Sequence, residues 1–328
     1  MSVHLILGGC GFIGRHVALA LHRRGDTVIL ADVVEPSDDM RAVLPAEFRK
    51  VGKSPVDWMR LVDGVDVIHH YAWTTVPATA DADPVTDLDA NLREMVSLLE
   101  VLRARKTAGI NTKVIFSSSG GTVYGPITRT PVNEEHSFNP TNAYGASKAA
   151  AEIYLGYYRK SHGVDCRIAR ISNPYGAGQN PAKRQGAAST FIFQALDGKP
   201  ISIWGDGSVV RDYIHIADLA AAMVALTDAP EEAISAVGQP VFNIGSGAGV
   251  SLNEILDVLR NDLDLEPIVT YQDGRSFDIP VSVLDISKAR SVLNWQPSLT
   301  FPEGYARMLS DLRQSSTLFS TLLDSADQ

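Results

Sequence analysis

The sequence has very little cysteine and no concentration of basic charge. Only Cys10 and Cys166 occur among its 328 residues, and no Cys-x-x-Cys pair is present, so it supports neither a disulfide framework nor a metal site. Lys and Arg total 29 against 38 Asp and Glu, which gives a net charge of -9 without basic runs. This balance argues against nucleic acid or an anionic membrane as the main partner and favours a small molecule.

The chain also lacks an apolar run of membrane-spanning length. Its N-terminus, MSVHLILGGC, has no basic region followed by an apolar region and a cleavage site. We therefore expect a cytoplasmic protein that contacts no membrane. With 45% hydrophobic and 20% charged residues, the chain can bury a full core.

Short apolar runs alternate with longer helical patterns through the first half of the chain. The runs are nearly continuous in apolar character, which is typical of parallel strands covered on both faces. They occupy residues 3–7, 27–30, 66–70, 113–118 and 165–170. Helical patterns lie between them, notably at residues 12–24, 87–107 and 145–161. This repeated unit predicts an α/β fold of the Rossmann type, with a doubly wound parallel sheet.

The organisation changes after residue 172, where glycine and proline become frequent in SNPYGAGQNPAKRQG. We expect one domain over residues 1–172 and a smaller α/β domain over residues 173–328. A helical pattern at residues 188–197 belongs to the second domain. The segment at about 213–244 again has a helix and a strand of the first kind, so we expect it to return to the large sheet.

Three glycines stand between the first predicted strand and the first predicted helix, in LGGCGFIGRH. Gly8, Gly11 and Gly14 allow the backbone to approach a pyrophosphate, and the N-terminus of the helix offers unpaired N–H groups. Asp32 ends the next strand, where a carboxylate binds both ribose hydroxyls and repels a 2'-phosphate. The arrangement predicts a dinucleotide site that prefers NAD to NADP.

Tyr144 and Lys148 lie four residues apart in NAYGASK, on one face of a predicted helix. A phenol is a poor base at neutral pH, but a neighbouring ammonium stabilises its phenolate and lowers its pKa. Such a pair can remove a proton from an alcohol during hydride transfer. Residues 116–125, FSSSGGTVYG, place further hydroxyls at the end of a predicted strand.

The glycine pattern, the serine-rich strand end, Tyr-x-x-x-Lys, NPYG and VRDYIHIADLA together resemble the extended short-chain dehydrogenase/reductase family, and within it the nucleotide-sugar epimerases and dehydratases. The resemblance covers almost the whole chain. It implies tightly bound NAD in the first domain and a nucleotide sugar in the second. The residues expected to bind the cofactor are Gly8, Gly11, Phe12, Ile13, Gly14 and Asp32, together with Tyr144 and Lys148.

The resemblance also implies roles for single residues in the reaction. Tyr144 would be the acid/base, and Lys148 would hold the nicotinamide ribose and tune Tyr144. Asn91, in the helix before the serine-rich strand, would contact the substrate, as would Asn173 in NPYG and Arg211 in RDYIH. A guanidinium suits the substrate diphosphate because it can bind two oxygens at once.

In similar epimerases a Ser or Thr at this strand end binds the sugar 4-OH and the tyrosine. Counting forward from Phe116 assigns that role to Ser119, whereas counting back from TVYG assigns it to Gly120, because this chain has one more residue than the usual spacing. Ser118 and Thr122 are the alternatives. We predict that Ser119 is catalytic and that Thr122 assists.

Similar 4,6-dehydratases carry an Asp-Glu pair after this hydroxyl, because eliminating water needs a further acid and base. This chain has Gly120 and Gly121 there. The resemblance therefore favours an NAD-dependent 4-epimerase, in which Tyr144 removes the 4-OH proton, C4 gives hydride to NAD, the 4-keto sugar turns, and hydride returns to its other face. A regulatory protein that only senses NAD is disfavoured because Tyr144 and Lys148 are both present, and a reductase because Asp32 favours recycled NAD.

The favoured substrate is a UDP-hexose, UDP-glucose or UDP-galactose, by resemblance. Val283 occupies the position of a gate residue that is bulky in epimerases confined to plain hexoses, and its size leaves room for the N-acetyl group of a UDP-N-acetylhexosamine. Lys183 or Arg184 could bind the carboxylate of UDP-glucuronate, so three substrates stay open, as does a dehydratase, decarboxylase or reductase on the same scaffold. Such proteins are commonly homodimers through helices that would here be residues 87–107 and 143–162.

Two further segments carry residues that differ from the family pattern or receive no role. Lys53 and Ser54 stand where such proteins usually carry Gly-Asp, whose Asp reaches the adenine amino group. His69, His70, Tyr71 and Trp73 lie at or just after the end of a predicted strand. They could line the cofactor pocket, but histidines there are more often structural, and we assign them no chemistry.

Overall fold

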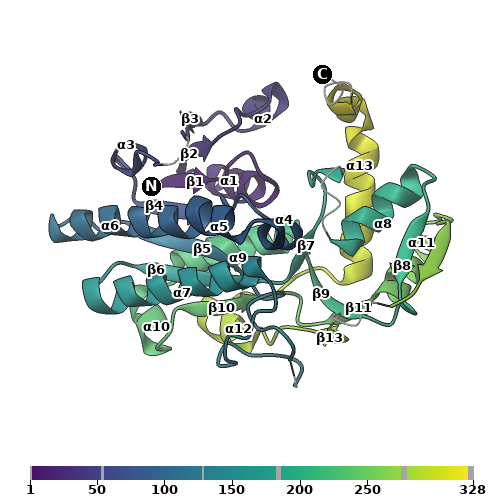
Figure 1. Cartoon of the computed structure of the whole chain (residues 1–328). Coiled ribbons are helices and arrows are strands. Elements are labelled where there is room, and N and C mark those ends of the chain that lie inside the picture. The colour runs from purple at the N-terminus through teal and green to yellow at the C-terminus, as the bar shows by residue number, and fades with distance from the viewer. Residues whose placement is uncertain (1, 53–54, 128, 182–185, 275–278, 324–328) are drawn as a thin grey trace.

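A parallel sheet of seven strands forms the centre of the computed structural model (Figure 1). The order across the sheet is β10-β6-β5-β4-β1-β2-β3, and every neighbouring pair is parallel. The strands are β1 (Val3–Leu7), β2 (Thr27–Asp32), β3 (Glu47–Lys50), β4 (Val67–His70), β5 (Lys113–Ser119), β6 (Cys166–Ile171) and β10 (Val241–Ile244). The structure describes residues 2–52, 55–127, 129–181, 186–274 and 279–323. The predicted α/β fold of the Rossmann type is confirmed.

Helices cover both faces of this sheet, which explains why its strands are apolar on both sides. The helices on one face are α1 (Phe12–Arg24), α9 (Ile216–Asp228) and α12 (Ser287–Leu293). Those on the other face are α3 (Trp58–Leu61), α6 (Glu94–Thr107) and α7 (Ala143–His162). Short helices α2 (Asp38–Val43), α4 (Pro77–Ala82) and α10 (Glu231–Ala236) lie in the connections. Within the described residues, no helix is both long and apolar enough to cross a membrane.

The predicted helix at residues 87–107 is divided into three pieces. α5 (Pro84–Asp87) is followed by a π-helical segment, η1 (Leu88–Arg93), and then by α6. A π-helical turn is wider than an α-helical one and occurs most often at functional positions. Here it contains Asn91, which is 4% exposed.

The remaining elements form a second layer of structure beside the large sheet, and Figure 1 shows α8, α11 and α13 grouped there. A four-stranded sheet joins β7 (Asn173–Tyr175), β9 (Val210–His215), β11 (Gly249–Ser251) and β13 (Val281–Ser282). A two-stranded sheet pairs β8 (Ile201–Trp204) with β12 (Val269–Gln272). The helices here are α8 (Ala187–Leu196), α11 (Leu252–Asn261) and α13 (Phe301–Leu323).

The chain returns from this second layer to the large sheet through α9 and β10. α9 packs on α1, and β10 pairs with β6. The return begins at Ile216 rather than at residue 213, because residues 213–215 belong to β9 of the four-stranded sheet. A division into two domains at residue 172 stays a prediction.

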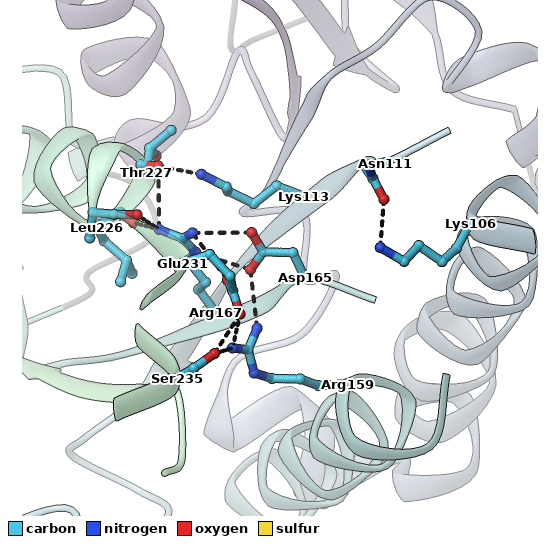
Figure 2. A network of polar contacts seen from close by, with 11 residues as sticks. Lys106, Asn111, Lys113, Arg159, Asp165, Arg167, Leu226, Thr227, Glu231 and Ser235 are labelled. Carbon is cyan, nitrogen blue, oxygen red and sulfur yellow. Dashed lines mark hydrogen bonds and ion pairs between the residues drawn. The ribbon is translucent and has the colours of Figure 1, made fainter. Parts of the chain in front are cut away.

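Arg167 ties β6 to the end of α9 at the amino edge of the large sheet. Its side chain is 1% exposed. Nη1 donates to the carbonyls of Leu226 at 2.7 Å and Ala229 at 2.6 Å, and Nε and Nη2 donate to Asp165 at 3.0 and 3.1 Å. Figure 2 shows this cluster with Arg159 bridging Asp165 and Glu231. One buried guanidinium thus satisfies backbone carbonyls that would otherwise lose their donor.

Replacing Arg167 with Met should lower the free energy of unfolding by about 3 kcal/mol, because the buried carbonyls and Asp165 lose their partner. Urea unfolding followed by circular dichroism measures the change. Arg103→Met is the matched control, since Arg103 makes an exposed pair with Glu100 one turn earlier in α6, and it should change stability by less than about 0.5 kcal/mol. Equal losses in the two variants would contradict this structural role.

Candidate active site

The loop between β1 and α1 holds glycine backbone in close contact with the start of the helix. Gly8 has a left-handed backbone with φ of +76°, and a Cβ at Gly14 would lie 2.1 Å from the Gly8 carbonyl oxygen. Gly11 caps α1 without a side-chain hydrogen bond, so no side chain occupies the N–H groups of the first turn. Phe12 and Ile13 begin α1 half-buried against the core. A pyrophosphate fits such a helix end.

Asp32 lies at the end of β2 and forms a hydrogen bond with the loop between β1 and α1. Its Oδ2 accepts a hydrogen bond from the Cys10 N–H at 3.0 Å, and its Oδ1 accepts from the N–H groups of Val33 at 2.7 Å and Val34 at 3.2 Å. A carboxylate can accept about four hydrogen bonds, so capacity is left for a ribose hydroxyl. The residues of this loop therefore fit NAD.

Tyr144 and Lys148 lie on one face of α7, near the carboxyl end of β5. Lys148 Nζ lies 5.7 Å from the centroid of the Tyr144 ring and donates to the Ser117 carbonyl at 2.7 Å. Burial lowers the pKa of Lys148 to about 7, against the attraction of Glu152 and Asp87. Burial, with a smaller effect of Asp87, raises the pKa of Tyr144 to about 12. Tyr144 is thus a protonated phenol near pH 7 unless positive charge is brought close to it.

The structure distinguishes among the three candidate hydroxyls of the serine-rich segment. Ser118 is buried, and its Oγ donates to the Glu152 carboxylate at 2.5 Å. Ser119 is the last residue of β5 and is half-buried. Thr122 Oγ1 is buried and has no hydrogen-bond partner among the described residues. The hydroxyl of Ser118 is therefore used in a buried hydrogen bond within the protein. Catalysis by Ser119 with help from Thr122 stays a prediction.

Asn91 connects the segment after β4 to α5. Its Oδ1 accepts from the N–H of Thr74 at 2.9 Å and from the Thr74 hydroxyl at 3.1 Å. Its Nδ2 donates to Thr75 Oγ1 at 3.3 Å and to Asp87 Oδ1 at 2.9 Å. Both acceptor positions and both donors of the amide are thus used within the protein. A substrate contact, as predicted for Asn91, would have to displace one of these bonds.

Asn173 and Arg211 both contact backbone in the four-stranded sheet. Asn173 Nδ2 donates to the Asp212 carbonyl at 2.8 Å. Arg211 Nη1 donates to the carbonyls of Val210 at 2.9 Å and Ile279 at 2.6 Å. These bonds fix where the two side chains lie, and their substrate contacts stay predictions.

Val283 is buried against Gly249, and the gate role expected for it stays a prediction. It is 7% exposed, and its Cγ2 would lie 2.9 Å from a Cβ placed on Gly249. Ser282 is half-buried and pairs in register with Arg211, so both side chains lie on one face of parallel strands. The sequence could not show which of two adjacent residues faces the core. Lys53, Ser54, Lys183 and Arg184 lie outside the described residues.

The sequence analysis missed the charged groups around Lys148. Glu152 is 4% exposed and binds the Arg170 guanidinium through Nη2 at 2.9 Å and Nε at 3.1 Å. Its place four residues after Lys148, on the same helix face, was a signal that could have found it. Asp87 is 1% exposed, and its place four residues before Asn91 was a similar signal, whereas its contact with Thr75 forms only in the folded chain.

A hollow of about 1030 Å³ lies at the opposite edge of the large sheet, beside the amino ends of β5, β6 and β10. Figure 2 shows two of its cations bound within the protein, Lys106 to Asn111 and Lys113 to the Thr227 carbonyl. We assign no ligand to this hollow. In the ranges the structure describes, no three His, Cys, Asp or Glu side chains gather as metal ligands.

Comparison with known proteins gives a consistent result over nearly the whole chain. The model of the NAD dependent epimerase/dehydratase family matches residues 4–245. The UDP-glucose 4-epimerase of Mycolicibacterium smegmatis is 31% identical, covering 95% of this chain and 99% of its own. The structure of the Thermus thermophilus UDP-glucose 4-epimerase complexed with NAD has a TM-score of 0.81 at 28% identity, covering 95% of this chain and 99% of that one. A UDP-N-acetylglucosamine 4-epimerase from Methanobrevibacter ruminantium, solved with UDP-N-acetylmuramic acid, has a TM-score of 0.84 at 26% identity, covering 96% and 99%.

Gly14→Ala should cause the purified protein to lose its bound NAD, because the new Cβ would displace the loop that approaches the pyrophosphate. NAD released by acid is measured per chain, together with the affinity for added NAD. Gly156→Ala in α7 is the control, since a Cβ there meets nothing within 4 Å. Wild-type NAD content in the Gly14 variant would contradict the cofactor site.

Proposed function

The chain belongs to the NAD-dependent epimerase/dehydratase family, and from this we propose that it catalyses the 4-epimerisation of a UDP-sugar, with UDP-glucose and UDP-galactose as the favoured pair. It is an NAD-dependent enzyme of the extended short-chain dehydrogenase/reductase family, as the sequence motifs predict. The relatives named above support UDP-sugars as the substrate class. Because the relatives named above are between 26% and 31% identical, the particular sugar is part of the proposal.

We favour epimerisation over elimination of water because few groups beside Ser119 can exchange a proton with the substrate. The two glycines that follow it supply no acid or base, and the buried carboxylates of Asp87 and Glu152 are bound by neighbouring side chains. Tyr144 and Lys148 remain in this part of the described structure, and we assign the proton exchange with the sugar to Tyr144 and the stabilisation of its phenolate to Lys148. Epimerisation needs one such group, which takes a proton from O4 and returns it, whereas elimination of water needs a further acid and base.

Tyr144 and Lys148 act together in this reaction. Tyr144 takes the proton from the sugar 4-hydroxyl, and its pKa of about 12 means that it needs positive charge nearby to do so near neutral pH. Protonated Lys148, one helical turn further along α7, stabilises the phenolate. NAD, when bound, supplies the hydride acceptor and donor and a second positive charge. Without cofactor, the charged fraction of Lys148 falls as the pH rises through about 7.

Purified protein without added cofactor should convert UDP-glucose, UDP-N-acetylglucosamine or UDP-glucuronate into its 4-epimer, as resolved by NMR. Tyr144→Phe removes only the hydroxyl and should lower kcat by about 100-fold to 10,000-fold, while bound NAD and thermal stability stay unchanged. Tyr271→Phe is the matched control, because Tyr271 lies on β12, is 56% exposed and belongs to no part of the site. If all three sugars return unchanged even with NAD supplied, a dehydratase, a reductase or another nucleotide sugar replaces this proposal.

UDP-N-acetylglucosamine is the alternative substrate that the structure favours. Ser282, the small side chain paired in register with Arg211, leaves more room than a bulky residue would at that position. For UDP-glucuronate, the two basic residues expected to bind its carboxylate, Lys183 and Arg184, lie outside the described residues. The three-sugar comparison distinguishes these substrates directly.

We further propose a homodimer formed through α7 and the adjoining η1 segment. Ile153, Tyr154 and Tyr157 in α7 and Leu88 in η1 are large apolar side chains with exposures between 41% and 61%. α7 packs on both η1 and α6, so these residues belong to one helical layer. An exposed apolar layer of this kind is typical of an interface between two copies.

Light scattering should give twice the chain mass for the wild type and the single chain mass for Ile153→Glu, because the substitution places charge in the buried interface. Val43→Glu is the control, since Val43 is equally exposed, at 62% against 61%, but lies on α2. A wild-type monomer, or equal masses for the two variants, would rule out this interface.

A further inference from the structure

The Lys148 ammonium lies among aromatic rings as well as beside the Ser117 carbonyl. Its Nζ is 3.9 Å from the centroid of the Trp73 ring and 4.6 Å from that of Phe116. Lys148 itself is 2% exposed, so little water competes for the charge. Attraction between a cation and an indole face is strongest in such a desolvated setting.

Trp73 is held by contacts between tilted aromatic rings and by the fixed position of Thr74, the next residue in the chain. Its ring lies 5.6 Å from the Phe116 ring, and its Nε1 is buried with no hydrogen-bond partner in the described part of the chain. Trp58 differs, because its Nε1 donates to Glu94 at 3.1 Å. The following residue, Thr74, is fixed by the Asn91 amide through its N–H and its hydroxyl. Contacts with the Lys148 ammonium and with the rings of Phe116 and His70 therefore set the plane of the Trp73 ring.

We propose that Trp73 is a positioning residue for Lys148. The face of its indole ring holds the Lys148 ammonium at the end of β5, and the contact between Asn91 and Thr74 holds the indole in place. Through Lys148, Trp73 acts on Tyr144. The catalytic part of this inference rests on the proposed function, whereas the effect on Lys148 itself does not.

Other charged and titratable groups face Lys148 and remain unchanged when Trp73 is replaced. They are Tyr144 and Glu152 on α7, Asp87 on α5 and His70 on β4. Burial lowers the pKa of Lys148, and cation–π attraction opposes that effect because it stabilises the charged form. Loss of the aromatic face should therefore lower the pKa of Lys148 further.

The test compares Trp73→Phe with Trp73→Leu and Trp73→Met. All three shorten the side chain, but only Phe keeps an aromatic face for the ammonium, so the difference between them isolates that face. The full-length protein is acetylated with trace acetic anhydride from pH 5 to pH 10, and peptide mass spectrometry follows Lys148. The neutral amine gains the acetyl group and acetate leaves, so the midpoint of labelling reports the protonation of Lys148.

Lys113 serves as the internal reference in every sample. It lies at the other end of β5, four residues or about 13 Å along the strand from Ser117, and its Nζ donates to the Thr227 carbonyl (Figure 2). Its labelling midpoint should be the same in all variants. A shift of Lys148 without a shift of Lys113 shows a local effect rather than general loosening of the fold.

We expect the Lys148 midpoint in the Leu and Met variants to lie about half a pH unit or more below that of the Phe variant. The alkaline limb of kcat/KM should move to lower pH by a similar amount. Equal Lys148 midpoints in the Phe, Leu and Met variants would overturn the inference. Absence of epimerase activity in the wild type would overturn the proposed function and leave the labelling result to decide the role of Trp73.

Discussion

A positive charge is buried at the carboxyl end of β5, and much of the site is arranged around it. Lys148 is held by the Ser117 carbonyl and the Trp73 ring, and Glu152 and Asp87 supply the negative charge that opposes its desolvation. Burial makes this ammonium both costly and effective, since the same low dielectric that lowers its pKa strengthens its action on a neighbouring phenol. This charge stabilises the phenolate of Tyr144, and without it Tyr144 would be a poor base near neutral pH.

A buried polar network connects this charge to distant parts of the chain. Glu152, one turn after Lys148, binds Arg170 of β6, and Arg170 Nη1 donates to the Tyr124 hydroxyl at 2.9 Å. Tyr124 in turn donates to Asn243 Oδ1 at 2.6 Å, and Asn243 Nδ2 donates to the Val132 carbonyl at 2.9 Å. Each of these four side chains, Glu152, Arg170, Tyr124 and Asn243, has hydrogen-bond partners within the network, which is the condition for burying them together. The catalytic helix is thereby fixed relative to β6, β10 and the loop that follows β5.

The sequence was informative where function depends on local spacing. The glycine loop, the acid at the end of β2 and the four-residue interval between Tyr144 and Lys148 are local features, and the fold class follows from the alternation of strands and helices. Contacts between distant segments could not be read this way. The π-helical setting of Asn91 and its bond to Thr74 form only on folding, so no sequence pattern indicated them, and its substrate contact stays a prediction. The burial of Val283 and the half-buried setting of Ser282 were equally hidden, because alternation along a short strand does not reveal which side faces the core.

The central claim is that hydride leaves C4 of the sugar and returns to the same carbon within one enzyme-bound cycle. The most direct measurement is to incubate the protein with UDP-glucose carrying deuterium at C4 in ordinary water, and to examine the product by NMR and mass spectrometry. The account predicts a 4-epimer that retains deuterium at C4. An epimer in which solvent hydrogen replaces the deuterium would contradict it, because the hydrogen would then have been removed as a proton by a base.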